Sequence, residues 1–226
     1  MRLILIALFL LASCGRPLTP NETAFLRAIQ GEQIDTARIR FHDGLAAGSV
    51  TYRRPIRPRL SCMERIWPPS RGETVTVSPG AMTLFHRVFY RKDLYRDDFL
   101  PDYPARIDLL DAMLLAHEAV DLGEKNNPAR TGYTPIKAMT EHGASNDPYL
   151  FDPDGTARFL DHGYEQQGAV VEEYVCCHVL DPGAPRTERL RRMIGAEMPI
   201  ARLNAALDNP EVVVPWAGLR QDGICR

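Results

Sequence analysis

The sequence predicts an α+β fold that is mostly helical, in which a small sheet or hairpin packs on two long helices. Residues 74–78, Thr-Val-Thr-Val-Ser, alternate in polarity with a period of two, as a half-buried strand does. Residues 82–90 are apolar and aromatic enough for a second strand, and Pro79-Gly80 would turn the first into the second. Long stretches with helical periodicity come after this pair.

The two long helices are expected at residues 104–126 and 164–180. Pro104 suits the first turn of a helix, and Asn126-Asn127-Pro128 would end it. Side chains at three- and four-residue spacing form one stripe on this helix: Ile107, Leu110, Leu114, His117 and Asp121. The other expected elements are shorter helices at 23–29, 187–194 and 201–207, and loop-rich stretches at 53–72 and 128–162.

The N-terminus has the layout of a secretory signal peptide. Arg2 supplies a positive charge, and the apolar run at 3–11 is too short to cross a bilayer, which takes about 20 residues. Leu-Ala-Ser-Cys at 11–14 resembles the lipobox of bacterial lipoproteins, in which the cysteine becomes the lipidated first residue after cleavage. An ordinary signal peptide with an incidental cysteine is the alternative. We therefore expect a signal peptide at 1–13, lipidated Cys14 with a tether at 14–33, and one domain at 34–226.

The lipobox resemblance implies an exported protein that lipid holds on the cell envelope. Gly15, rather than Asp, follows the cysteine, which favours the outer membrane or its periplasmic face. No second apolar run of about 18 residues occurs, so the lipid should be the only membrane anchor. The 27 basic and 29 acidic residues nearly balance, which gives no reason to expect a nucleic-acid partner.

Four further cysteines are expected to form two disulfides, because an even number in an oxidising compartment indicates a disulfide framework. Neighbouring cysteines rarely bond to each other, so Cys176 and Cys177 should each take a distant partner. Two connectivities remain, in which Cys62 bonds to one of them and Cys225 to the other. A metal-thiolate site is the alternative.

The chemistry is expected on the first long helix, in the segment Leu-Ala-His-Glu-Ala-Val-Asp at 115–121. Residues i and i+4 share a helix face, and the H-E-x-x-H motif uses this spacing: two histidines bind zinc and the glutamate activates a water. Here His117 and Glu118 fill the first two places, and Asp121 stands at the second histidine. A carboxylate oxygen binds zinc at about 2.0–2.2 Å, but one histidine with carboxylates is a harder donor set that also suits Mn²⁺ or Mg²⁺.

Two segments carry a wider resemblance: Leu-Leu-Ala-His-Glu-Ala-Val at 114–120 and Tyr-Glu-Gln-Gln-Gly-Ala-Val-Val-Glu-Glu-Tyr at 164–174. Over roughly residues 34–181 the chain resembles bacterial secreted and lipoprotein domains with a zinc-peptidase core, related to the core domain of contractile-injection-system-associated proteins. Such domains usually show His-Glu-x-x-His followed by Val-Trp-Gln, whereas this chain continues Asp121-Leu-Gly-Glu. The resemblance implies a zincin-like fold, a zinc cofactor and a peptide or envelope-protein substrate.

The resemblance favours Glu165, which opens Glu-Gln-Gln-Gly, as the third metal ligand beside His117 and Asp121. Glu118 would be the catalytic base. Glu172, seven residues beyond Glu165 and on the same helix face, is the alternative ligand or a group that orients the histidine.

Asp121 leaves two functions open. The first is a metallopeptidase-like hydrolase, in which the strand near residues 83–90 lines the cleft as an edge for an extended peptide. The second is a non-catalytic envelope lipoprotein that uses a degenerate zincin fold for binding or scaffolding. In the second case His117 and Asp121 would form a hydrogen-bonded pair on a partly buried face. In both cases Gly168 would let the two long helices approach closely.

Overall fold

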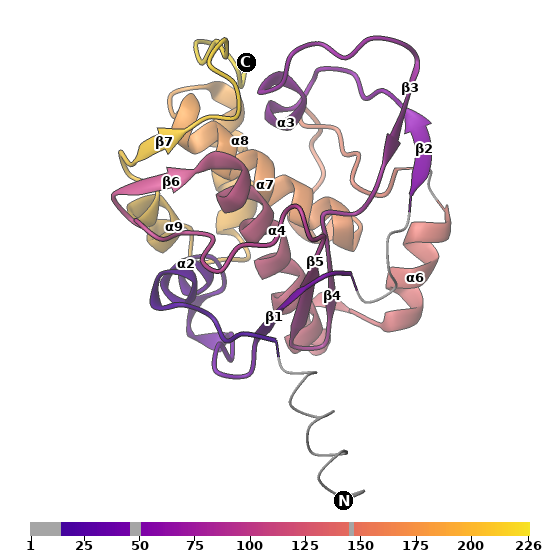
Figure 1. Cartoon of the computed structure of the whole chain (residues 1–226), viewed down its shortest axis with the longest axis vertical. Coiled ribbons are helices and arrows are strands. Elements are labelled where there is room, and N and C mark those ends of the chain that lie inside the picture. The colour runs from indigo at the N-terminus through magenta and orange to yellow at the C-terminus, as the bar shows by residue number, and fades with distance from the viewer. Residues whose placement is uncertain (1–14, 46–50, 145–146) are drawn as a thin grey trace, which may run out of the picture.

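The computed structural model describes residues 15–45, 51–144 and 147–226, which form an α+β fold (Figure 1). Within these residues there are eight α-helices, two short 3₁₀ turns (Gly31–Gln33 and Phe159–Asp161) and seven strands in three small sheets. The expected α+β class is therefore confirmed. The expected signal peptide and Cys14 lie outside the described residues.

Helices α4 (Leu109–Asn126) and α7 (Tyr164–Leu180) pack against each other at the centre of the molecule (Figure 1). α7 has the bounds that the sequence predicts. α4 begins later than the predicted residue 104, because Asp108 caps it and accepts hydrogen bonds from the backbone N–H groups of Leu110 and Asp111 at 3.0 and 3.2 Å. The preceding residues form β6 (Arg106–Asp108), which pairs in parallel with β7 (Glu211–Val213).

The main sheet has three strands in the order β1 (Arg40–Asp43), β5 (Arg87–Tyr90), β4 (Ala81–Leu84). The prediction of one strand at 82–90 is wrong: β4 and β5 are the two arms of a tight hairpin. The predicted pairing of residues 74–78 with that strand is also wrong. β3 (Thr74–Val77) pairs instead with β2 (Tyr52–Pro55), which lies inside a predicted loop. β4 is an edge strand of the main sheet and lies against α4.

The remaining helices surround the central pair. Three confirm shorter helices of the sequence prediction to within a few residues: α2 (Pro20–Gln30), α8 (Pro185–Gly195) and α9 (Ile200–Ala206). Three others fall in stretches predicted as loops: α3 (Cys62–Arg65), α5 (Pro128–Thr131) and α6 (Pro135–Ala144). No helix in the described part of the chain has both the length and the apolar character needed to cross a membrane.

The N-terminal segment is folded rather than extended as a tether. Arg16 and Phe41 exchange two backbone hydrogen bonds of 2.9 Å, so the chain is joined to β1 from its second described residue onward. The Arg16 guanidinium also donates to both carboxylate oxygens of buried Glu22, at 2.7 and 2.8 Å. Thr19 and Glu22 form a capping box that starts α2.

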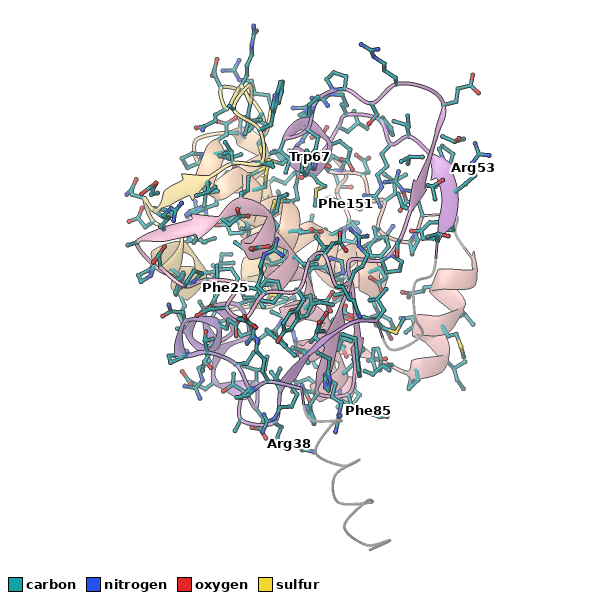
Figure 2. All side chains as sticks on the ribbon, in the orientation of Figure 1. Phe25, Arg38, Arg53, Trp67, Phe85 and Phe151 are labelled. Carbon is teal, nitrogen blue, oxygen red and sulfur yellow. A yellow bond between two sulfur atoms is a disulfide. The ribbon has the colours of Figure 1, made fainter. Side chains whose placement is uncertain are left out.

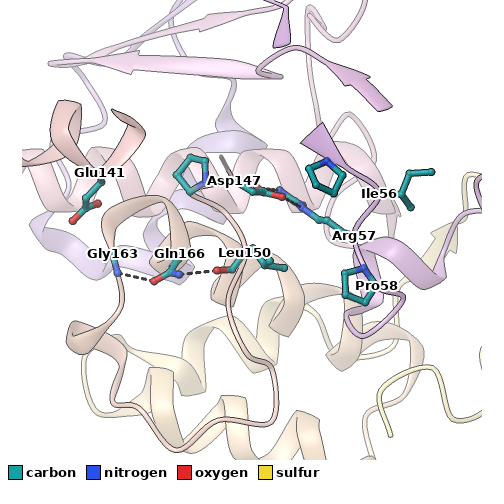
Figure 3. A pocket seen from close by; sticks show the side chains of 10 residues that line it. Ile56, Arg57, Pro58, Glu141, Asp147, Leu150, Gly163 and Gln166 are labelled. Carbon is teal, nitrogen blue, oxygen red and sulfur yellow. Dashed lines mark hydrogen bonds and ion pairs between the residues drawn. The ribbon is translucent and has the colours of Figure 1, made fainter. Parts of the chain in front are cut away.

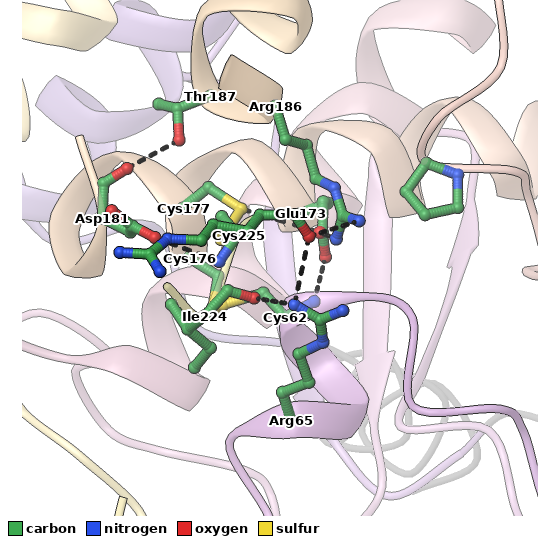
Figure 4. Close-up of a disulfide and its surroundings, with 12 residues drawn as sticks. Cys62, Arg65, Glu173, Cys176, Cys177, Asp181, Arg186, Thr187, Ile224 and Cys225 are labelled. Carbon is green, nitrogen blue, oxygen red and sulfur yellow. Dashed lines mark hydrogen bonds and ion pairs between the residues drawn. A yellow bond between two sulfur atoms is a disulfide. The ribbon is translucent and has the colours of Figure 1, made fainter. Parts of the chain in front are cut away.

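Two disulfides join α7 to distant segments (Figure 4). Cys62 bonds to Cys176, and Cys177 bonds to Cys225, which is one of the two predicted connectivities. All four sulfurs are thus engaged, so the structure does not support the metal-thiolate alternative. The first disulfide ties α3 to α7, and the second ties the C-terminal segment to the same helix turn.

A buried ion pair reinforces this region. Glu173 is 2 % exposed, and it accepts hydrogen bonds from the backbone N–H of Cys62 at 2.6 Å and from Arg186 at 3.3 Å. Burial raises the pKa of Glu173 to about 7, although both of these partners lower it.

Candidate metal centre

One face of α4 carries four buried ionisable side chains: His117, Glu118, Asp121 and Glu124, each less than 8 % exposed. His117 and Asp121 share a helix face, as the sequence predicts, and Glu118 and Glu124 lie beside them. They line a cavity of about 910 Å³, whose other walls come from α7, β4 and the segment 52–67. Cavities of this size hold small-molecule or peptide ligands in other proteins.

His117 lies between two carboxylates of α7. Its Nε2 is 3.2 Å from Oε2 of Glu165, and its Nδ1 is 3.3 Å from Oε2 of Glu172. Burial alone would lower the pKa of His117, but the hydrogen bonds to these two carboxylates raise it well above its ordinary value. Glu172 therefore occupies the place of a group that orients the ring, and Glu165 approaches the nitrogen on the other side.

Gly168 makes this arrangement possible. A Cβ atom at position 168 would lie 2.6–2.8 Å from three atoms of the His117 ring. The imidazole thus packs directly on the backbone of α7, which is the close approach that the sequence predicts for this glycine.

His117, Asp121 and Glu165 can offer one ligand atom each with all three atoms within 4.8 Å of one another. One oxygen of Asp121, Oδ1, is buried and has no hydrogen-bond partner among the described residues. A buried oxygen of this kind is costly unless it is paired, so it fits a bound cation. The donor set of one imidazole and two carboxylates fits zinc and harder divalent ions.

The other oxygen of Asp121, Oδ2, accepts a hydrogen bond of 2.8 Å from the ammonium of Lys125, one helix turn further along α4. Both side chains are about nine-tenths buried, and the ammonium also lies 5.6 Å from the centre of the Tyr133 ring. Asp121 raises the pKa of Lys125 above its ordinary value despite burial, which lowers it. The structure therefore does not pair His117 with Asp121; Lys125 is the partner of that aspartate.

Glu118 lies beside the three candidate ligands and is held by β4. The hydroxyl of Thr83 donates to its Oε2 at 2.6 Å. Burial first, and then the negative charge of Asp121, raise the pKa of Glu118 to about 7. A carboxylate with such a pKa exchanges protons readily near neutral pH, as a general base must.

Glu124 is an additional buried acid that the sequence analysis did not single out. Both of its carboxylate oxygens are buried without a hydrogen-bond partner in the described parts of the chain. Burial and the charge of Asp121 raise its pKa to about 10. With a pKa this high the Glu124 carboxyl keeps its proton near neutral pH, so it adds a buried polar group to the cluster but no negative charge.

Sequence reasoning missed Lys125 and Tyr149, and it placed the strand near residues 83–90 at the cleft without predicting the hydrogen bond from Thr83 to Glu118. Lys125 could have been found, because it follows Asp121 by four residues on the same helix face. Thr83 and Tyr149 carry no such signal, since strand pairing and a loop bring them to the cavity. The Tyr149 ring lies 5.7 Å from the His117 ring and lines the same cavity.

A second cavity of about 660 Å³ (Figure 3) shares Arg57, Pro58 and Leu150 with the first. Its floor is the ion pair between Arg57 and Asp147, with N–O distances of 2.5 and 2.6 Å. Gln166 closes one side through hydrogen bonds with Gly163 and Leu150. Arg57 and Asp147 are paired with each other, and Glu141 accepts a hydrogen bond of 2.8 Å from the backbone N–H of Tyr164.

Comparison with known proteins adds no relative: no family model, no curated protein and no solved structure matches this chain.

Proposed function

We propose that this chain is an exported, lipid-anchored protein with a metallopeptidase-like domain, in which His117, Asp121 and Glu165 bind a divalent cation. The observation that supports the proposal most is that these three residues, which line the large cavity, can offer ligand atoms within 4.8 Å of one another. Zinc is the ion that the H-E-x-x-H-like spacing favours. The carboxylate-rich set makes Mn²⁺ a plausible competitor.

The chain's own groups suit peptide hydrolysis. A bound divalent ion would acidify a water and polarise a carbonyl oxygen. Glu118 can take up the proton that such a water releases, because its pKa is near 7 and Thr83 fixes its carboxylate. Glu172 holds the His117 ring, and the free edge of β4 offers backbone groups to an extended peptide.

Metal analysis tests this proposal. Purified protein, dialysed against zinc or manganese and then against buffer, is expected to retain about one ion per chain, and His117→Ala should abolish retention. His178→Ala is the matched control, because His178 lies on α7 and is hydrogen-bonded to Tyr174 rather than to the cluster that includes His117 of α4. Equal retention by the two variants, or no retention by the parent, would refute the proposed site.

A non-catalytic binding or scaffolding role is the second candidate, and the ion pair of Lys125 with Asp121 favours it. An ammonium that neutralises a proposed ligand weakens the case for a tightly bound ion. Glu118→Gln separates the two functions. Hydrolysis requires that this variant retain the metal and lose cleavage of a peptide library, whereas a scaffolding role requires that cellular function be unchanged.

The envelope location has its own test. Cys14→Ser should release the protein from the membrane fraction. By mass spectrometry the parent should carry lipid at its N-terminus, and the variant should not. An unchanged fractionation pattern together with an unmodified parent would contradict lipid anchoring while leaving the metal site untouched.

A further inference from the structure

The hairpin between β4 and β5 projects a phenylalanine into solvent. Leu84 pairs with Arg87, so Phe85 and His86 form a two-residue turn. Phe85 is 81 % exposed, the highest value among the large apolar side chains of the described residues. Its φ of 55° lies in the left-handed region, which a bulky residue rarely adopts and which hairpin turns of this length usually give to glycine or asparagine. The turn thus presents an apolar side chain at a position where glycine would be more stable.

The surroundings of this turn are apolar and basic. Leu84 is 44 % exposed, and Arg38 and Arg87 are both exposed. Burial first, and then the charge of nearby Arg38, lower the pKa of the His86 imidazole, whereas Asp35 raises it. An apolar tip flanked by arginines is the arrangement with which proteins contact anionic membrane surfaces.

The same end of the molecule carries the start of the folded chain (Figure 2). Gly15 lies against the His42 ring, so closely that a Cβ atom there would come within 2.6 Å of Nε2. Two residues back along β1, the backbone N–H of Arg40 donates to the carbonyl of His86 at 2.9 Å. From strand geometry the distance between residues 15 and 85 is roughly 10–15 Å.

We propose that the turn at Phe85 inserts into the bilayer surface to which lipid on Cys14 anchors the protein. This inference rests on the proposed lipid anchor. Because Arg16 is fixed to β1 and to Glu22, little free chain separates the lipid from the folded domain. The anchor therefore holds this end of the molecule against the membrane, and the phenyl group enters the interface with the arginines facing lipid phosphates.

The insertion would fix the orientation of the cleft. Thr83, which holds Glu118, lies two residues before Phe85 on β4, about 7 Å along the strand. The edge strand of the cleft would then rise directly from the membrane surface. The ligands that reach the metal centre would be segments of proteins or peptides that lie close to the bilayer.

Quenching by brominated lipids tests the insertion. The full-length lipidated protein is reconstituted in vesicles of phosphatidylethanolamine and phosphatidylglycerol, with or without dibrominated acyl chains. The parent already contains Trp67 and Trp216, so the emission of the new tryptophan in Phe85→Trp is taken as the difference from the parent. This emission should shift to the blue on vesicles, and most of it should be quenched by the brominated lipid. Trp67 lies in the other half of the molecule from Phe85 (Figure 2).

Phe85→Gly separates a membrane role from a structural one. Glycine suits the left-handed turn, so the melting temperature should equal or exceed that of the parent, while amides 84–87 lose the exchange protection that vesicles give the parent. A lower melting temperature with unchanged protection, or an unquenched tryptophan on lipidated, vesicle-bound protein, overturns the insertion but leaves the anchor standing. A parent that carries no lipid and does not bind vesicles overturns both.

Discussion

Gly168 is the position at which the packing of the two central helices can be tested most directly. In Gly168→Ala the new methyl group would lie 2.6 Å from Cε1 of His117, whereas ordinary contact begins near 3.4 Å. The ring must therefore retreat by about 0.8 Å. Its hydrogen bonds to Glu165 and Glu172, at 3.2 and 3.3 Å, are already long and cannot both survive this shift.

The expected energy follows from two opposing effects. Alanine is a better helix former than glycine by about 1 kcal/mol. Overpacking costs about 1–3 kcal/mol, and each lost hydrogen bond to a charged group costs about 1.5–3 kcal/mol. With one of the two hydrogen bonds lost, we therefore expect Gly168→Ala to lower the free energy of unfolding by about 1.5–5 kcal/mol, and to weaken metal binding because the His117 nitrogen moves.

Gly123→Ala is the matched control on α4. Its methyl group would meet the side-chain amide of Gln30, the far end of a flexible chain that can rotate towards solvent. This variant should be within about 1 kcal/mol of the parent, since helix propensity offsets the loss of the contact with Gln30. Urea denaturation in the presence of chelator measures both variants. If Gly168→Ala were as stable as the parent, or Gly123→Ala equally damaged, the proposed packing of His117 on α7 would be wrong.

Three other variants probe the cation balance, the disulfides and the buried acid. Lys125→Met should bind zinc or manganese more tightly than the parent by calorimetry, because Asp121 no longer has an internal partner; weaker binding would contradict a competing ammonium. Loss of the 48-residue link in Cys177→Ser/Cys225→Ser should cost about 4 kcal/mol of unfolding free energy, and a change below about 1 kcal/mol would argue against the disulfide. Because folding raises the pKa of Glu173, its protonated carboxyl stabilises the fold fully below pH 4.5, and this stabilisation is lost as the pH rises to about 7. Over that pH range the parent should lose up to about 3 kcal/mol of unfolding free energy, and Glu173→Gln should not show this loss. Denaturation at several pH values measures both.

Local patterns in the sequence predict the helices well. α7 has the predicted bounds because Asp181-Pro182-Gly183 ends it. For α4 only the predicted start is wrong, because the helix begins after its N-cap Asp108 and not at Pro104. Strand pairing could not be obtained in this way. β3 and β2 are joined across a stretch of about 20 residues, and such non-local pairings depend on the tertiary packing rather than on period or turn residues.

The residues of the candidate site can likewise be predicted from the sequence only in part. His117 and Asp121 share a face because of helix periodicity, and that pattern is visible in the sequence. Glu165 needed a resemblance to be chosen, because helix geometry alone did not separate it from Glu172. The hydrogen bond from Thr83 to Glu118 could not be predicted from the sequence, because only the packing of β4 on α4 brings the two side chains together.

The structure changes the interpretation of Asp121, because it shows the partner of its carboxylate. An aspartate at this place adds a negative charge to a buried cluster, and Lys125 supplies the compensating charge one helix turn away. At the position where an H-E-x-x-H motif has its second histidine, this chain thus carries an aspartate whose charge Lys125 balances.

A double variant tests this coupling. Asp121→His alone would leave the buried ammonium of Lys125 without its partner and close to the cation, so we expect only a small gain in zinc affinity. Asp121→His/Lys125→Met should gain more than the two single variants together, because each change removes the obstacle to the other. Strictly additive affinities by calorimetry would show that Lys125 and position 121 act independently, and the charge-balance argument would then fail.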